Sequence, residues 1–586
     1  MYILGISCFY HDSSATLLKD GKVVAAAEEE RFSRKKHDNS FPQKAVQYCL
    51  ESQNISIDDI EYVAFYEKPL LKFERVLSQH LEMFPWSFKV FVSSMPSWIT
   101  EKIRIQKIII KKLGYKKDIF FVGHHLSHAA STFLPSPFEK AAILTVDGVG
   151  EWSTTAIGKG EGNKIELIKE IKFPHSLGLL YSTVTAYLGF SVNNSEYKVM
   201  GLSAYGNMDR QSNDYYQKLL KTIDIKDDGS YRLNMSYFKY HYADRMPAEK
   251  FCNLLKGPIT KKNSEMNERH KDIAAAVQLI TEDVMTKMLK YLHAETGMDN
   301  VVIAGGVALN SVYNGKILAR TPFKDIWIQP NSSDGGTSMG AALFAYNSIL
   351  KKERNYVLEN AYLGPGFSNE NIEAFLKERK IVFTEFASDS ELIEKTAELI
   401  YENNVIGWFQ GRMEWGPRAL GARSILSNPA NVDMQEILNL KVKHREKFRP
   451  FAPVVCLDDA LKYFECDIPV PKPADYMLMV YPIKNEFRKL IPAVTHVDGS
   501  GRLQTIRREQ NELYYDLIKK FGEYSGIPIL INTSFNVRGE PIVCTPEDAY
   551  RCMMGTGIDY LVAGKFMIKR EDNLRDAWDS EKTAND

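Results

Sequence analysis

A short unit of β-structure occurs twice in the first third of the chain, and it limits the possible folds more than any other feature. Each copy has an apolar strand, a tight polar turn and two further strands; the copies span residues 3–27 and 141–168, with polar turns at 11–14 and 147–150. Short apolar runs separated by turn residues are typical of β-hairpins. The repeat predicts two related halves whose polar turns could hold phosphate or a metal ion. Two unrelated meanders would give the same pattern.

Farther along, the pattern changes to strand, loop and helix. An apolar run at 301–304 leads into Gly305 and Gly306, and a run at 326–328 leads into a glycine-containing polar loop at 331–336. Glycines between a strand and a helix let a ligand approach the backbone N–H groups at the helix N-terminus. Neither loop is a dinucleotide-binding motif or a Walker P-loop, so both of those folds are disfavoured. Duplicated hairpin units open each half of the sugar-kinase/actin fold, and this part of the chain resembles that α/β, nucleotide-clamping fold.

The chain is too long for one hydrophobic core. Its 586 residues predict two or more domains. A charged stretch begins at Lys351, and we place the boundary there, which gives domains of residues 1–350 and 351–586. The second domain also mixes strands, for example at 405–409 and 527–531, with helices, and we expect it to be α/β as well.

The charge balance excludes several classes of partner. Lys and Arg number 74, and so do Asp and Glu, so no net charge favours nucleic acid or an anionic membrane. Residues 103–117 have the pattern of a basic amphipathic helix, and we interpret them as a solvated helix that packs its isoleucines. No apolar run approaches the roughly 18 residues that span a bilayer. The seven cysteines form no CxxC pair, which favours a reducing cytoplasm.

The strongest local signal for chemistry is a group of histidines after the apolar run 119–122. His124 and His128 are four residues apart, so on a helix their imidazoles share a face and could bind one ion. Asp147 and Asp334, in glycine-flanked turns after strands, could complete the set. Two histidines with carboxylates favour iron, manganese or zinc over magnesium. His125 could be a ligand in place of His124. Alternatively, His124 and His128 form a structural pair that binds no ion.

A second signal lies in the C-terminal half. Residues 411–450 contain eight Lys or Arg against four Asp or Glu, with glycine, proline and aromatic residues between them. The basic residues of interest are Arg412, Arg418, Arg423, Lys443, Arg445 and Arg449. Guanidinium groups bind phosphate in a bidentate manner. The polar segment 532–539 follows an apolar strand and could hold an amide or a nucleotide. A solvated basic face is the alternative.

These signals together resemble one family, the nodulation-protein and tobramycin-type O-carbamoyltransferases. The motifs that carry the resemblance run in order through the chain: His11-Asp12, 28–36, 124–128, 147–148, 196–202, 305–310, the strings around Arg418 and Arg449, 495–499 and 532–539. The resemblance implies an N-terminal sugar-kinase/actin-like domain that transfers the carbamoyl group. It also implies a C-terminal α/β domain, similar to threonylcarbamoyl-adenylate synthases, that forms carbamoyl-adenylate from carbamoyl phosphate and ATP.

The resemblance also implies roles for individual residues. Metal ligands, for a divalent ion of which Fe²⁺ is the first choice, would be His124, His128, Asp147 and Asp334. Nucleotide contacts would come from Lys36, Lys198, Gly305, Gly306 and Asn310, with Mg²⁺ accompanying ATP. Carbamoyl phosphate and the adenylate would be bound by Arg418, Lys443, Arg449, Arg502, Asn532, Ser534 and Arg538. His11 has a side-chain pKa suited to a general base for the acceptor hydroxyl.

The acceptor is the part of the reaction that the sequence defines least. We expect a hydroxylated small molecule, and the stretch 215–263, most aromatic at 231–242, either lines its pocket or is a packed insertion. A tRNA threonylcarbamoyl transferase is the first alternative, but its substrate calls for a basic stripe. A non-catalytic nucleotide-binding module of the actin type is the second. A homodimer is compatible with the sequence.

Overall fold

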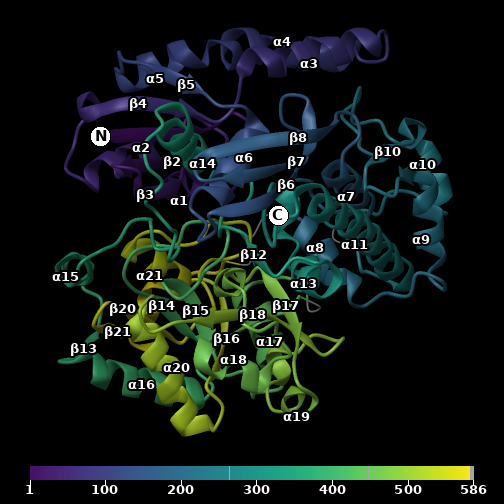
Figure 1. The fold of residues 1–586 in the computed structure, drawn as a ribbon. Coiled ribbons are helices and arrows are strands. Elements are labelled where there is room, and N and C mark those ends of the chain that lie inside the picture. Colours follow the sequence, from purple (N-terminus) through teal and green to yellow (C-terminus); the bar gives the residue numbers. More distant parts are fainter. Residues whose placement is uncertain (263, 447–448, 581–586) are drawn as a thin grey trace. The chain divides into compact units, whose positions relative to one another are not determined.

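The structure is a computed structural model that describes residues 1–262, 264–446 and 449–580 (Figure 1). Lys447, in the basic segment, lies outside the described residues. Contacts between residues divide the chain into two compact units, which we call unit 1 (1–26 and 39–358) and unit 2 (27–38 and 359–586). The chain therefore leaves unit 1 after Leu358, and a short N-terminal segment packs with unit 2.

Unit 1 contains two five-stranded sheets with the same topology. The order of the first is β3 (Lys22–Glu28), β2 (Ser14–Lys19), β1 (Tyr2–Ser7), β4 (Ile60–Phe65) and β5 (Ile119–Phe121). The order of the second is β12 (Asp325–Trp327), β11 (Asn300–Ala304), β6 (Lys140–Val146), β7 (Ser153–Glu161) and β8 (Lys164–Lys172). In the first sheet β1 pairs antiparallel with β2 and parallel with β4. In the second sheet β6 pairs in the same way, antiparallel with β7 and parallel with β11. The internal repeat and the sugar-kinase/actin-like α/β fold of this part are thus confirmed.

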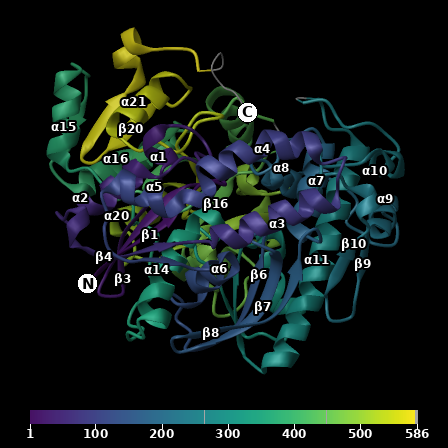
Figure 2. The same cartoon turned by 90° about the horizontal axis from the view of Figure 1, so that it is seen from above.

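Helices cover these sheets. The helices of unit 1 are α2 (Gln43–Glu51), α3 (Pro69–Glu82), α4 (Phe88–Thr100), α5 (Ile105–Leu113), α6 (His124–Phe133), α7 (Leu177–Tyr187), α8 (Glu196–Ser203), α9 (Asp214–Leu219), α10 (Glu249–Leu254), α11 (Glu268–Thr296), α12 (Ser311–Asn314), α13 (Ile317–Arg320) and α14 (Thr337–Phe344). Figure 2 shows α3, α4 and α5 in front of the strands when unit 1 is seen from above. Helix α6 packs closely on α14, because a Cβ atom at Gly340 would lie only 1.8 Å from the carbonyl oxygen of Ser127. A side chain at this glycine would push the two helices apart.

Unit 2 is built on one mixed sheet of nine strands. Their order is β13 (Thr384–Glu385), β21 (Phe566–Lys569), β20 (Tyr560–Ala563), β14 (Ile406–Phe409), β15 (Arg423–Ser427), β19 (Ile529–Ser534), β16 (Ala452–Cys456), β18 (Ser500–Ile506) and β17 (Met479–Pro482). Its helices are α1 (Glu30–Ser33), α15 (Asn369–Glu378), α16 (Asp389–Tyr401), α17 (Met434–Ile437), α18 (Leu457–Tyr463), α19 (Asn485–Arg488), α20 (Glu512–Ser525) and α21 (Pro546–Met554). Trp408, Leu426 and Leu530 lie in the core between the sheet and α16 and α20. The second part is α/β, as expected.

The segment 27–38 is held in unit 2 by buried charged groups. The guanidinium of Arg31 donates to the carbonyl of Gly416 at 2.8 Å and pairs with Glu28 at 2.6 Å. Arg34 donates to the carbonyls of Pro541 and Ile542. These bonds link positions several hundred residues apart in the sequence. Within the described residues, none of the helices has the length and hydropathy needed to cross a membrane.

Candidate functional site

Four buried side chains of unit 1 converge on one point. His124 and His128 come from α6, Asp147 follows β6, and Asp334 begins the short 3-10 helix η6 (Asp334–Gly336). Each offers a ligand atom, and these atoms lie within 4.8 Å of one another. The Nε2 atoms of the two histidines are 3.1 Å apart, and that of His124 is 3.2 Å from Asp147 Oδ2. This arrangement could hold one metal ion.

The local sequence explains why the four side chains meet. Spacing of four residues puts His124 and His128 on one face of α6. Asp147 follows β6, and the N–H of Gly306, which follows the neighbouring parallel strand β11, donates to Asp147 Oδ1 at 3.0 Å. Gly305 has a φ of 94°, and a Cβ there would lie 2.2 Å from the carbonyl oxygen of Val146. Only glycine permits this close approach of the two strand ends.

The carboxylate of Asp334 indicates that a cation fits this site. The residue is 0% exposed, and neither carboxylate oxygen accepts a hydrogen bond from any described residue. Its charged neighbours are histidine Nε2 atoms at 3.4 Å (His128) and at 3.7 Å (His124 and His11). A buried carboxylate without hydrogen bonds costs several kcal/mol unless a cation compensates it. Two histidines and two carboxylates are a suitable donor set for a borderline divalent ion.

His125, the rival ligand, is engaged elsewhere. Its Nδ1 lies 2.8 Å from Thr145 Oγ1 and its Nε2 lies 2.9 Å from the carbonyl oxygen of Ser153. Burial lowers the pKa of His125 to about 3, so its ring stays neutral. The side chain therefore ties α6 to β6 and β7, and the cluster contains His124 in its place.

His11 lies at the edge of the cluster. Its Nδ1 bonds Asp12 Oδ2 at 2.9 Å, and its Nε2 is 3.7 Å from Asp334 Oδ2. Burial would lower the pKa of His11, but the carboxylates of Asp334, Asp12 and Asp147 outweigh it and raise the pKa to about 10. Without a cation the ring is protonated at neutral pH. A divalent ion held by the two carboxylates would offset their field and favour the neutral ring.

The residues expected to contact a nucleotide belong to both units. Gly305 and Gly306 lie beside Asp147, as described above. Lys198 is buried on α8, with Nζ 5.6 Å from the centre of the Phe190 ring. The side-chain amide of Asn310 caps α12 and exchanges two hydrogen bonds with Gln278, so both of its polar atoms have protein partners. Lys36 belongs to unit 2, where its charge acts on Lys443.

In unit 2, part of the expected anion site lies on one face of the sheet. Asn532 and Ser534 are two residues apart on β19, so their side chains lie on the same face of the sheet. Arg502 and Gln504 have the same spacing on β18. The amide nitrogen of Asn532 donates to Gln504 Oε1 at 2.6 Å and to the carbonyl of Ala419 at 3.1 Å. The loop that carries Arg418 therefore packs beside this face. Asn532 Oδ1 is buried and has no hydrogen-bond partner among the described residues, so it is available to a ligand.

Lys443 continues the same face. Its Nζ donates to the carbonyl and Oγ of Ser534 and to Asn536, including Asn536 Oδ1 at 2.8 Å. Burial first, and then the nearby positive charges of Arg445, Arg449 and Lys36, hold the pKa of Lys443 well below its usual value. Arg538 donates to the carbonyl of His444, and Arg449 lies 3.3 Å from Glu446. Several cationic groups thus share one region, which an anion would stabilise.

Two arginines of the predicted pocket have structural roles. Arg423 is 0% exposed and donates to the carbonyls of Gln410, Ala422, Pro365 and Gly411, and its guanidinium lies 3.7 Å from the centre of the Phe409 ring. Arg412 donates to two backbone carbonyls at Leu363 and Gly364. The basic segment singled out in the sequence thus includes two arginines whose guanidiniums donate to backbone carbonyls.

Glu414 carried no sequence signal for its role, whereas Asn536 belongs to the polar segment 532–539 that the sequence singled out. Oε1 of Glu414 accepts the backbone N–H groups of Leu420, Ala422 and Arg423 and so shapes the loop that presents Arg418. Asn536 positions Lys443. Glu414 stood among arginines and was counted only as a negative charge. Its role depends on backbone N–H groups, which a sequence pattern does not distinguish.

Two family models match the chain. They are the Carbamoyltransferase N-terminus, over residues 2–343, and the Carbamoyltransferase C-terminus, over residues 397–570. The chain belongs to the carbamoyltransferase family. It is an enzyme that transfers carbamoyl groups, as the sequence resemblance implied.

Named relatives agree with this family. The chain is 46% identical to an uncharacterized protein, sll1178, of Synechocystis, over 97% of both chains. It is 35% identical to the nodulation protein NolNO of Sinorhizobium fredii, over 97% of this chain and 80% of that protein. Among solved structures, the ROK hexokinase of Thermus thermophilus overlaps 60% of this chain and all of its own, at 12% identity and a TM-score of 0.30. At this TM-score the overlap supports no functional conclusion.

Proposed function

We propose that this carbamoyltransferase activates carbamoyl phosphate with ATP and delivers the carbamoyl group to a hydroxyl of a small molecule. Unit 2 would form carbamoyl-adenylate, and unit 1 would transfer its carbamoyl group. Overall, carbamoyl phosphate, ATP, water and the acceptor would give the carbamoylated acceptor, AMP, pyrophosphate and phosphate. The observation that carries the proposal is the presence of two chemically different sites, an acidic and imidazole cluster in unit 1 and a cationic face in unit 2.

The cationic face of unit 2 suits the anions of the first step. Carbamoyl phosphate and ATP are both polyanions, and the amino groups of Lys443 and the guanidiniums of Arg418, Arg449, Arg502 and Arg538 would bind their phosphates. The buried, unpartnered Oδ1 of Asn532 is an acceptor, which suits the NH₂ of the carbamoyl group. Burial lowers the pKa of Lys443, and a bound anion would favour its charged form.

In unit 1 the proposed metal ligands are His124, His128, Asp147 and Asp334. The bound ion, for which Fe²⁺ is our first choice, would supply positive charge for an adenylate phosphate. Asp147 is oriented by the N–H of Gly306, and this glycine-lined loop would let a nucleotide phosphate approach the backbone. Mg²⁺ would accompany ATP.

His11 is our candidate for the base that removes the proton of the acceptor hydroxyl. Asp12 bonds Nδ1 and therefore leaves Nε2, which points toward Asp334, as the nitrogen that takes the proton. Orientation of the imidazole by a carboxylate is the arrangement that general bases commonly use. The base must be neutral, so its action depends on compensation of the nearby carboxylates.

The proposal is tested by following ATP with the intact enzyme. With carbamoyl phosphate present, we expect pyrophosphate and AMP to form, and exchange of labelled pyrophosphate into ATP. ATP turnover that requires threonine and bicarbonate instead would favour a threonylcarbamoyl transferase. ATP binding without pyrophosphate release, whatever the co-substrate, would contradict the adenylate step. A screen of hydroxylated natural products for carbamoylation would then identify the acceptor.

A further inference from the structure

Helix α3 has partly reversed faces: it buries two basic side chains and exposes three leucines, beside the exposed Glu74 and Glu82. Lys72 and Arg75 are each only 6% exposed, whereas Leu70 and Leu81 are each 69% exposed. A helix on the surface of a globular protein normally buries its apolar stripe. This reversal leaves large apolar side chains of α3 facing outward.

The inward face of α3 has a reason to be charged. Lys72 forms an ion pair with the buried Glu67, and its Nζ lies 5.0 Å from the centre of the Tyr10 ring. The Tyr10 ring is in turn 4.6 Å from that of His11. The inner face of α3 is thus adjacent to the candidate active site. The outer face of α3, which carries exposed leucines, is therefore open to a binding partner.

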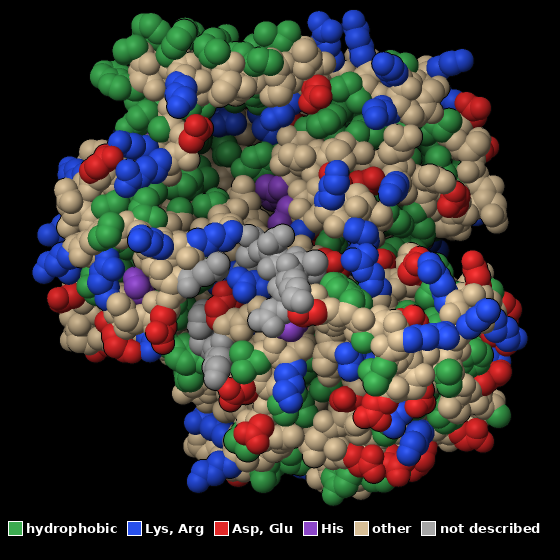
Figure 3. Space-filling view, turned by 180° about the vertical axis from the view of Figure 1, so that it is seen from behind, with side chains coloured by type: hydrophobic (Ala, Val, Ile, Leu, Met, Phe, Trp, Pro, Cys, Tyr) green, Lys and Arg blue, Asp and Glu red, His purple; other side chains and the backbone are tan. Residues whose placement is uncertain are grey.

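The apolar surface continues through the turn after α3 and along α4. We call it the apolar ridge and define it by Leu70, Leu81, Phe84, Trp86, Phe88 and Val92, all of them exposed. Among the described residues, 21 large apolar side chains are exposed, and nine of these lie between residues 70 and 110. Figure 3 shows apolar side chains gathered along the upper left edge, over α3 and α4. Patches of this kind on a soluble protein mark an interaction site.

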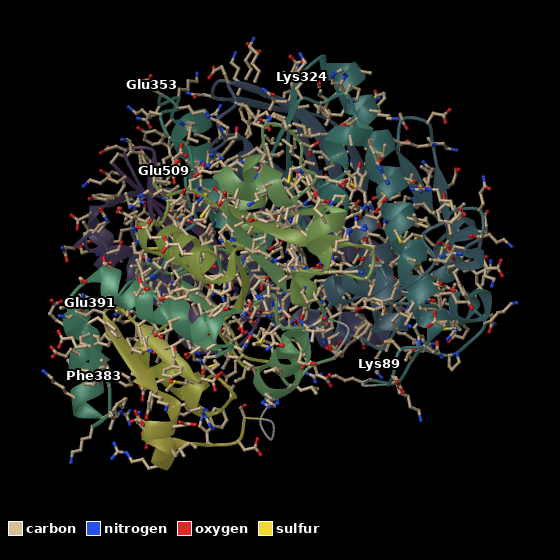
Figure 4. All side chains as sticks on the ribbon, turned by 90° about the horizontal axis from the view of Figure 1, so that it is seen from below. Lys89, Lys324, Glu353, Phe383, Glu391 and Glu509 are labelled. Carbon is tan, nitrogen blue, oxygen red and sulfur yellow. The ribbon has the colours of Figure 1, made fainter. Side chains whose placement is uncertain are left out.

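The surroundings of the ridge are strongly basic. Residues 68–117 contain eleven Lys or Arg, of which Lys72 and Arg75 are buried, against three Asp or Glu, although the whole chain is balanced. Helix α5 buries Ile105 and Ile109, as the sequence predicted, and exposes Lys107, Lys111 and Lys112, which form no ion pair with any described residue. Lys89, at the other end of the ridge, lies at the outer edge of the molecule (Figure 4). Positive charge therefore borders the ridge and exceeds the negative charge of the exposed Glu74, Glu82 and Glu101.

We propose that the apolar ridge and the lysines of α5 dock on an anionic lipid surface. Aromatic and aliphatic side chains would enter the boundary between headgroups and acyl chains, and the lysines would lie near anionic headgroups. Trp86, which is 71% exposed, is of the residue type that prefers this boundary. The expectation of no membrane partner came from the net charge, the lack of a membrane-spanning apolar run and residues 103–117, and it did not consider the exposed side chains of α3.

The positive charge also argues against a second copy of this chain as the partner that covers the apolar ridge. A symmetric dimer would place the same patch on both sides of the interface. Two surfaces with the same large excess of positive charge repel each other, which opposes such a contact. An anionic surface is attracted by the same charge. The proposal concerns docking and does not depend on which carbamoyl acceptor the enzyme uses.

The test is co-sedimentation of the full-length enzyme with vesicles. Vesicles of 30% phosphatidylglycerol in phosphatidylcholine are compared with pure phosphatidylcholine, at low and at high salt. One variant, Trp86→Ser with Phe88→Ser, removes apolar side chains, and another, Lys107→Gln, Lys111→Gln and Lys112→Gln, removes charge. The control is Ile468→Ser, because Ile468 is even more exposed, at 81%, but lies in unit 2. All of these positions are exposed, and unchanged circular dichroism and thermal unfolding establish that each variant is folded.

We expect binding to the anionic vesicles that weakens with salt. Each lysine near an anionic surface contributes about a fivefold increase in partition coefficient, so the triple variant should lose roughly a hundredfold. The apolar variant should lose at least about tenfold, and the control should bind normally. Absence of vesicle binding, or binding that neither variant weakens, would overturn the proposal. So would a concentration-dependent dimer that only Trp86→Ser with Phe88→Ser abolishes, because a second copy would then cover the ridge.

Discussion

Replacement of Asp334 by Asn should remove metal-dependent stability from unit 1. Asn has the same shape as Asp but carries no negative charge. Asp334 is wholly buried, and the described residues give its carboxylate no hydrogen bond. The substitution therefore removes the charge offered to a cation, and with it part of the field that raises the pKa of His11.

The magnitude follows from the loss of one anionic ligand. A charge-assisted contact contributes about 1.5–3 kcal/mol, and a divalent ion roughly doubles the charge involved. A loss of about 3–6 kcal/mol corresponds to a dissociation constant raised roughly 100-fold to 10,000-fold. At a metal concentration of 100 times the wild-type dissociation constant, the wild type gains about 2.7 kcal/mol of stability. The variant gains at most about 0.4 kcal/mol under the same conditions.

The assay is thermal unfolding of the full chain after treatment with a chelator, with and without Fe²⁺, Mn²⁺ or Zn²⁺, and without oxygen for iron. For a domain of this size we expect the wild-type Tm to rise by about 5 °C with the best metal, and that of Asp334→Asn by less than about 1 °C. Elemental analysis should show about one ion per wild-type chain and little in the variant.

The matched control is Asp325→Asn. Asp325 lies on β12, only nine residues earlier, and its carboxylate bonds the N–H of Ile326 and faces no histidine of the cluster. It should bind metal and gain Tm as the wild type does. If Asp334→Asn retained the wild-type metal content and the same rise in Tm, the four-residue metal site would be refuted.

Three further predictions concern other groups. Arg449→Ala should weaken carbamoyl phosphate binding by about 1.5–3 kcal/mol in a titration, because a bidentate anion contact is lost, and unchanged affinity would exclude Arg449 from the anion site. His11→Asn should slow transfer to the acceptor by about 10²–10⁴ while pyrophosphate release continues, and transfer at the normal rate would show that another group takes the proton. Burial lowers the pKa of His496 to about 4, so below pH 6.5 the unfolded chain binds a proton that the folded chain does not, and stability falls as the pH drops toward 4. Between pH 7 and pH 5 this group should lower the free energy of unfolding by about 2 kcal/mol. The His496→Gln variant should lack this part of the pH dependence in urea unfolding, and an unchanged pH dependence would contradict the assignment.

The sequence was most informative where the pattern is local. Both halves of unit 1 were predicted, because apolar runs and turn residues repeat in the same order and β-hairpins form between neighbouring strands. The spacing of His124 and His128 placed them on one helix face, since helical geometry fixes that relation. Asp147 and Asp334 were plausible partners because each follows a strand, and the structure brings all four together.

The sequence was least informative where a side chain serves a distant backbone. Arg423 and Arg418 look alike in a basic segment, but only Arg423 is buried among four carbonyls. Residues 27–38 pack with unit 2 through the bond from Arg31 to Gly416, which no periodicity reveals. The faces of α3 are partly reversed because of charged groups near Tyr10, so its apolar residues could not be assigned to the core or the surface from spacing alone.

The two copies of the sheet contribute different chemical groups to the candidate active centre. The turn after β1 and the turn after β6 occupy the same position in the two copies of the repeat, and they carry His11-Asp12 and Asp147-Gly148 respectively. One copy thus presents a titratable ring and the other an acidic side chain to the same place, so that neither half-domain contains a complete centre. Separately expressed halves would have to reassemble before they regained the centre. Mutations in one turn could change its chemistry without altering the backbone frame that both turns share.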